Sequence, residues 1–192
     1  MKMMRRHSIQ GLPRAGAAGV LGLALVISLP THAEKMFSEV VDSNGTISLP
    51  SDFRKSMVHL GSWFVPEGGA SGFHDVYTEA ETVAAYRRTG KFPDGATLVK
   101  ELRAADKGDY TTGTGVSYPT SIKQWFVMVK DTKGRFAGNP AWGDGWGWAL
   151  FKPDQPAQSV VKDYRGDCIG CHVPAKANDY VYTEAYPTLR TK

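Results

Sequence analysis

The strongest constraint on this chain is a five-residue run near its C-terminal end, Cys168-Ile169-Gly170-Cys171-His172. The run fits the C-x-x-C-H pattern, in which two thiols form thioether bonds to the vinyl groups of haem and the adjacent imidazole becomes an axial iron ligand. The chain contains 2 cysteines, and both belong to this run. We therefore predict one covalent haem c, attached at Cys168 and Cys171, with His172 as the axial ligand.

Other chemistries share parts of this spacing. Two cysteines in an exported chain would usually form a disulfide. A thioredoxin-like redox pair would need a β-α-β context, and a zinc site would need a fuller set of ligands than the sequence offers near the motif. Both remain alternatives to haem attachment on the residues alone.

The N-terminal segment has the three parts of a secretory signal peptide. Residues 1–14 contain four basic side chains and no acidic one, residues 15–29 are uncharged and mostly apolar, and Thr31-His32-Ala33 places small residues where cleavage occurs. A membrane anchor would need about 20 apolar residues, and this run stops at Pro30. We predict a signal peptide over residues 1–33, cleaved after Ala33, and export to the periplasm.

The charge balance of the remaining chain argues against a polyanionic partner. The formal net charge is +4, and it comes from the leader, because residues 34–192 carry 19 basic and 19 acidic side chains. A neutral domain gives no reason to expect nucleic acid as a partner. With 42% hydrophobic residues, residues 34–192 are expected to form one domain with its own core.

Short strand-like runs separated by turn signals predict the fold class. A capping box at Thr78-Glu79-Ala80-Glu81 opens a predicted helix that reaches Thr89, with Gly90 as its C-cap. The long 3.6-residue periodicity of a four-helix bundle is missing. The sequence predicts an α+β fold, mainly an antiparallel sheet with a few short helices and with haem packed against the sheet. Strands are expected at residues 61–65, 73–77, 96–102, 121–130 and 146–151, and a helix at 162–172.

The second axial ligand decides what a haem can do. Electron carriers commonly hold iron between His and Met, but no methionine follows His172. We therefore predict an open sixth position that binds a small molecule. A simple electron-transfer cytochrome would instead need a ligand from Met128, His59 or His74.

Several motifs, in the same order along the chain, resemble the cytochrome P460 family. That resemblance implies a mainly antiparallel β fold, a homodimer, and oxidation of hydroxylamine or related nitrogen species at a five-coordinate haem whose proximal ligand matches His172. The related cytochromes c′-β share the fold and bind nitric oxide or carbon monoxide. The matching segments are Phe92–Leu102, Val129–Asp131, Arg135–Ala137, Trp146–Phe151, Asp167–His172 and Tyr186–Leu189.

The resemblance also singles out Lys100. Its position matches the lysine that, in P460 proteins, is covalently bonded to the porphyrin edge, which makes it the candidate for a haem cross-link. Strand alternation places Lys100 on the same face as Ala96 and Leu98, so its amine would emerge from an apolar surface. The alternative is an exposed lysine at a strand end, paired with a nearby acid.

Phe126 departs from the family pattern. It shares a strand face with Gln124 and Met128, and it occupies the position where the comparison with P460 proteins leads us to expect a carboxylate that takes protons from hydroxylamine. A phenyl ring cannot accept a proton, and it favours uncharged diatomic gases. The distal pocket candidates are Phe126, Met128 and His74. The acids considered as substitutes for the carboxylate are Asp75, Glu101, Asp109 and Asp131.

Two functions therefore follow from the sequence. One is an oxidoreductase that takes electrons from hydroxylamine or a related small nitrogen oxide and passes them to a soluble redox partner. The other is a binding protein for nitric oxide or carbon monoxide without turnover. Lys100 favours the first function, and Phe126 favours the second.

Overall fold

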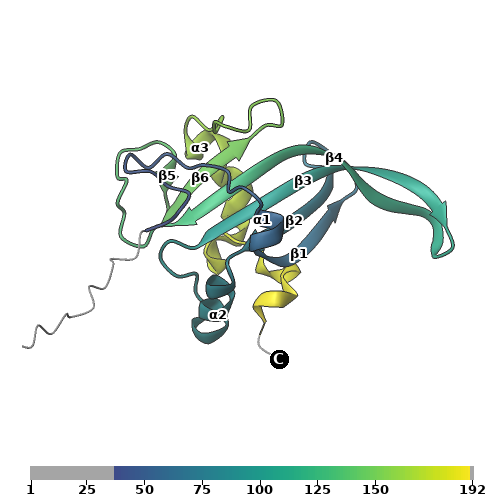
Figure 1. Cartoon of the computed structure of the whole chain (residues 1–192), viewed down its shortest axis with the longest axis horizontal. Coiled ribbons are helices and arrows are strands. Elements are labelled where there is room, and N and C mark those ends of the chain that lie inside the picture. Colours follow the sequence, from purple (N-terminus) through teal and green to yellow (C-terminus); the bar gives the residue numbers. More distant parts are fainter. Residues whose placement is uncertain (1–36, 191–192) are drawn as a thin grey trace, which may run out of the picture. The chain divides into compact units, whose positions relative to one another are not determined.

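A computed structural model describes residues 37–190, so the predicted signal peptide over residues 1–33 lies outside the described residues. The described chain is built on one six-stranded sheet with the strand order β1-β2-β3-β4-β6-β5, and every neighbouring pair is antiparallel (Figure 1). The strands are β1 (Val58–Val65), β2 (Gly72–Thr78), β3 (Thr97–Tyr110), β4 (Gly113–Lys130), β5 (Trp142–Gly143) and β6 (Trp146–Phe151).

The helices are short, and the predicted α+β class is confirmed. They are α1 (Phe53–Ser56), α2 (Ala80–Thr89), α3 (Tyr164–Asp167), α4 (Ile169–His172) and the 3-10 helices η1 (Val173–Asn178), η2 (Thr183–Ala185) and η3 (Pro187–Leu189). Within residues 37–190, no helix has the length and apolar character needed to cross a membrane.

Both faces of the sheet are covered. Leu98 and Trp148 belong to a core cluster that also contains side chains of α2 and of the C-terminal segment from α3 onward. Val99 and Phe151 point to the opposite face, where residues 37–57 pack against them. Because both faces are covered, burial runs almost without interruption over residues 97–102 of β3 and 146–151 of β6 instead of alternating.

The helix α2 begins one residue later than the predicted capping box implies. Its C-cap is Gly90 in the left-handed conformation, as predicted, but its N-cap is Glu79 rather than Thr78. The Thr78 hydroxyl instead donates a hydrogen bond to the Thr97 carbonyl at 2.7 Å. Thr78 ends β2 and is completely buried, so its hydroxyl bonds to the neighbouring strand and not to the helix.

The strands β3 and β4 run well beyond the predicted ranges of 96–102 and 121–130. The pairing of β3 with β2 ends at Arg103, and the pairing of β4 with β6 begins at Trp125, yet β3 and β4 stay paired as far as Tyr110 and Gly113. The result is a two-stranded hairpin that projects from the sheet (Figure 1). The sequence did not predict this hairpin, because main-chain pairing requires no hydrophobic pattern and the hairpin shows little apolar–polar alternation.

Glu101 anchors the face of β3 that is covered by residues 37–57. Its side chain is almost completely buried, and it accepts hydrogen bonds from Arg54, from Arg103 Nε at 2.6 Å and from Trp125 Nε1 at 2.9 Å. Burial opposes ionisation of Glu101, but the bonds from Arg54, Arg103 and Trp125 outweigh it and hold the pKa below its usual value. The carboxylate therefore stays charged and joins three side chains behind the sheet.

We expect Glu101→Ala to lower the free energy of unfolding by about 3 kcal/mol, near the lower end of what breaking a buried ion pair costs, because both arginines can turn toward water. Urea denaturation followed by tryptophan fluorescence measures this loss. Lys55→Ala, which removes the exposed ion pair with Asp52, is the matched control and should change stability by less than about 1 kcal/mol. Equal losses in the two variants would contradict the anchoring role.

Candidate haem-binding site

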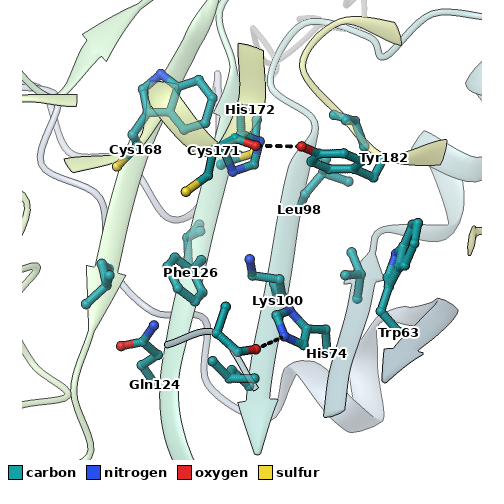
Figure 2. A pocket seen from close by; sticks show the side chains of 18 of the residues that line it. Trp63, His74, Leu98, Lys100, Gln124, Phe126, Cys168, Cys171, His172 and Tyr182 are labelled. Carbon is teal, nitrogen blue, oxygen red and sulfur yellow. Dashed lines mark hydrogen bonds between the residues drawn. The ribbon is translucent and has the colours of Figure 1, made fainter. Parts of the chain in front are cut away.

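A cavity of about 480 Å³ lies between the sheet and the C-terminal segment. One of its walls is the C-x-x-C-H motif, and the facing wall is the surface of β3 and β4 (Figure 2). The structure brings together in its lining the predicted haem ligands, the cross-link candidate and the three distal pocket candidates: Cys168, Cys171, His172, Lys100, Phe126, Met128 and His74.

The predicted helix over residues 162–172 is present as two one-turn helices, α3 and α4. The break falls at Cys168, whose backbone leaves the helical range, and the Asp163 side chain caps α3 by accepting a hydrogen bond from Arg165 N at 2.9 Å. The two thiols are three residues apart and free of any disulfide. Burial, followed by the charge of Asp167, raises the pKa of the Cys168 thiol to about 11.

The His172 ring is oriented by a backbone group. Its Nδ1 lies 2.7 Å from the carbonyl oxygen of Tyr180, and a carbonyl can only accept a hydrogen bond, so Nδ1 carries the proton. This assignment leaves Nε2 unprotonated, which is the form that ligates iron. Burial lowers the pKa of His172 and keeps the ring neutral, and the edge of Trp148 packs against it with ring centroids 4.9 Å apart.

Lys100 lies on the cavity wall that faces the C-x-x-C-H motif, near the start of β3. Its cross-strand partners are Val76 on β2 and Phe126 on β4, and its Nζ lies 4.0 Å from the centre of the Phe126 ring. Burial lowers the pKa of Lys100 to about 8, while the two cysteine thiols act in the opposite direction. A thioether sulfur cannot ionise, so haem attachment would remove this opposing effect and favour the neutral amine further. Lys100 has no ion pair among residues 37–190, contrary to the alternative of a paired surface lysine.

His74 supplies a polar group on the same wall. It is 8% exposed, and its Nε2 lies 2.7 Å from the Ala70 carbonyl, so Nε2 is the protonated nitrogen and Nδ1 is left as an acceptor. Burial lowers the pKa of His74, as do the charges of Lys100 and Lys123, so the ring is neutral at pH 7. A neutral imidazole with a free acceptor nitrogen can take up a proton.

The acids considered as substitutes for a distal carboxylate lie elsewhere. Asp75 accepts a hydrogen bond from Ser62 at 2.6 Å on the other side of β2, Glu101 is turned to the opposite face, Asp109 binds Gly115 N on the hairpin, and Asp131 pairs with Arg135. The one acid in the cavity lining is Asp167, which stands beside Cys168 and accepts bonds from the backbone of Lys162 and Asp163. In the described part of the chain, the strands therefore present no carboxylate to the cavity.

His59, one of the possible sixth ligands, does not reach this cavity. Its ring bonds to Ser62 and packs at a tilt against Tyr77, with ring centroids 5.1 Å apart, and it does not line the cavity. Met128 and His74 do line the cavity, so of the three residues they alone remain near the site.

Several groups that line the cavity or orient its residues carried no signal in the sequence. The Tyr180 carbonyl is a backbone group, and the Tyr182 hydroxyl donates to the Cys171 carbonyl at 2.6 Å. Gly69 and Ala70, in the loop before β2, also line the cavity, and Lys123 holds that loop through a bond to the Ser71 carbonyl at 2.8 Å. Such contacts form only when distant segments of the chain come together in the fold, so the spacing of residues in the sequence does not predict them.

These residues fit haem c. Two thiols and an imidazole with its Nε2 free converge on one wall, and the cavity lies within the range of about 300–1,000 Å³ that is usual for small-molecule and cofactor sites. The facing wall is mainly apolar, as a porphyrin ring requires. Cys168 and Cys171 would hold the vinyl groups, and His172 would ligate the iron.

The comparison with known proteins agrees with this geometry. The family model described as Cytochrome P460 matches residues 50–183, which is most of the chain. No individual curated protein matches the sequence. The matched region contains the six strands, the C-x-x-C-H motif and the sheet wall of the cavity, and the chain therefore belongs to the cytochrome P460 family, which makes it a c-type haem cytochrome.

Proposed function

We propose that this protein is an exported P460-type cytochrome that oxidises hydroxylamine or a related small nitrogen compound. The observation that carries the proposal is the buried amine of Lys100, which shares one cavity with the C-x-x-C-H motif. When bound, haem would supply an iron centre that accepts electrons from the substrate and passes them on.

The position of Lys100 supports a third covalent bond to the porphyrin, in addition to the two thioethers. Its pKa of about 8 makes the neutral form of the amine far more accessible near neutral pH than in an ordinary lysine, and a neutral, desolvated amine is nucleophilic. The new bond would replace an N–H bond and a C–H bond, so its formation is an oxidation that delivers two electrons to an external oxidant. Neighbouring apolar side chains would keep water away from the amine.

His74 is the residue that we assign to proton removal. Oxidising hydroxylamine releases protons as well as electrons, and Phe126 cannot accept them. The His74 ring is neutral, lines the same cavity and has Nδ1 free because Nε2 is bound to Ala70. It would replace the carboxylate that is missing from the strand wall.

A gas-binding protein of the c′-β kind is the second candidate. The Phe126 ring and the lack of a described carboxylate on β3 and β4 favour it, because an apolar wall admits nitric oxide or carbon monoxide more readily than polar ligands. In that case haem would be held by Cys168 and Cys171 alone, and Lys100 would remain a free amine.

The location of the protein, its redox partner and its assembly are part of the same proposal. The leader pattern in residues 1–33 supports export to the periplasm, and the balanced charge of residues 34–192 supports a partner other than nucleic acid. We propose a soluble redox partner as the electron acceptor and a homodimer as the assembly, on the family likeness.

The cross-link gives the first test. Proteolysis and mass spectrometry of the holoprotein should find the Lys100 peptide joined through haem to the Cys168–Cys171 peptide. Lys100→Met should keep the haem on its cysteines but lose this link, and hydroxylamine oxidation should fall by about 10–100-fold, the usual cost of losing a group that tunes a metal site. Lys107→Met, on the projecting hairpin, is the control and should change neither result. A free Lys100 in the wild-type protein would overturn the cross-link and favour gas binding.

His74→Gln gives the second test, because a glutamine amide can still donate to Ala70 but cannot take up a proton. We expect kcat/KM for hydroxylamine to fall by about 10²–10⁴-fold. In the wild-type protein, kcat/KM should decline as pH falls through the His74 pKa. Burial, helped by the charges of Lys100 and Lys123, holds that pKa below 6.5 and outweighs the opposing hydrogen bond to the Ala70 carbonyl.

Protonation of hydroxylamine itself affects the wild-type protein and His74→Gln alike. The difference between their two pH profiles therefore measures the contribution of His74. Carbon monoxide association, measured by flash photolysis, should be the same in both proteins and so show an intact cavity. Identical pH profiles would remove His74 from the proposal.

A further inference from the structure

The carbonyl that orients His172 belongs to an unusual stretch of backbone. Tyr180 and the preceding Asp179 both have positive φ angles, 65° and 59°. Consecutive non-glycine residues in this left-handed region are uncommon, and they persist only where the surrounding structure holds them there. The Tyr180 carbonyl therefore points at Nδ1 of His172 because other contacts fix this dipeptide.

Asp179 is held by the end of β4 and the start of β6. Its carboxylate accepts a bond from Lys130 Nζ at 2.8 Å, and its carbonyl accepts one from Trp146 Nε1 at 3.0 Å. Lys130 and Trp146 are themselves cross-strand partners. The rigid sheet thus fixes the first residue of the dipeptide.

Tyr180 is held by Asp144, in the turn between β5 and β6. The Tyr180 hydroxyl donates to Asp144 Oδ1 at 3.2 Å, and the Tyr164 hydroxyl donates to Asp144 Oδ2 at 3.0 Å. Tyr164 opens α3, four residues before Cys168, and Tyr180 lies eight residues after His172. One carboxylate therefore connects both flanks of the haem-binding motif to the end of the sheet where Figure 1 places β5 beside β6.

We propose that Asp144 is a positioning residue for the iron ligand, acting through Tyr180 to hold the carbonyl that accepts the Nδ1 proton of His172. A hydrogen bond at this nitrogen fixes the ring plane and makes the imidazole a better electron donor to a metal. A firmer bond stabilises the oxidised iron and lowers its reduction potential. The inference rests on haem ligation by His172, and it holds for either proposed function.

Tyr180→Phe in the holoprotein tests the inference, because it removes the bond to Asp144 and keeps the ring and the carbonyl. The iron–histidine stretch in the resonance Raman spectrum of the reduced protein should move to lower frequency. The reduction equilibrium should shift toward the reduced form by about 3–10-fold, or about 28–59 mV at 59 mV per tenfold for one electron.

Tyr164→Phe is the matched control, since it removes the other phenol bond to the same carboxylate without touching the residue that faces His172. We expect it to lower the urea midpoint as Tyr180→Phe does, and to leave the stretch and the potential unchanged. Asp144→Ala should shift the stretch and the potential. Asp144→Asn, whose amide oxygen can still accept from Tyr180, should keep both close to their wild-type values, so this pair tests the same point independently.

Two results would overturn the inference. If Tyr180→Phe and Tyr164→Phe moved the potential equally, or if neither moved it, Asp144 would be a structural residue only. A wild-type protein without thioether-bound, His172-ligated haem would overturn the inference together with both proposed functions. The two failures are distinguishable, because the second is visible in the spectrum of the wild-type protein before any variant is made.

Discussion

Two consecutive charged residues, Lys100 and Glu101, lie in the part of β3 that pairs with both β2 and β4, and they determine how the two sides of the sheet differ. The pleat sends them to opposite faces. Glu101 is joined by hydrogen bonds to Arg54, Arg103 and Trp125, and it fixes β3 from behind. Lys100 has no such partner among residues 37–190, and it projects into the cavity. One face therefore holds a paired, charged group, and the other holds an amine that can lose its proton.

The cavity also depends on contacts between segments that are far apart in the sequence. The C-x-x-C-H motif sits on two one-turn helices, which are too short to be stable by themselves. Their position comes from the sheet, through the packing of Trp148 against His172 and the anchoring of Tyr180 at the β5–β6 turn. The site is thus assembled by tertiary structure around a motif that has little secondary structure of its own.

Patterns of neighbouring residues in the sequence predicted those features of the site that depend on residue spacing alone. The cysteine spacing located the site. Strand alternation grouped Lys100 with Leu98 on one strand and Phe126 with Met128 on another, and the structure brings both groups into one cavity lining. The projecting hairpin was not predicted, because main-chain pairing leaves no hydrophobic period. The Tyr180 carbonyl was not predicted either, because every residue has a carbonyl and only the folded chain shows which one faces His172.

Lys100 and Phe126 favour opposite functions when the sequence is considered alone, but their chemistry is compatible in one cavity. An ionised carboxylate about 4 Å from Nζ would stabilise the protonated amine by about 4 kcal/mol at an effective dielectric constant of 20. It would hold the pKa of Lys100 high and keep the amine unreactive. The face of the Phe126 ring, 4.0 Å from Nζ, stabilises the protonated amine by only about 0.5–2 kcal/mol. Phe126 thus lets burial dominate and lower the pKa of Lys100 to about 8, and His74, which is neutral, can serve as the base without raising that pKa again.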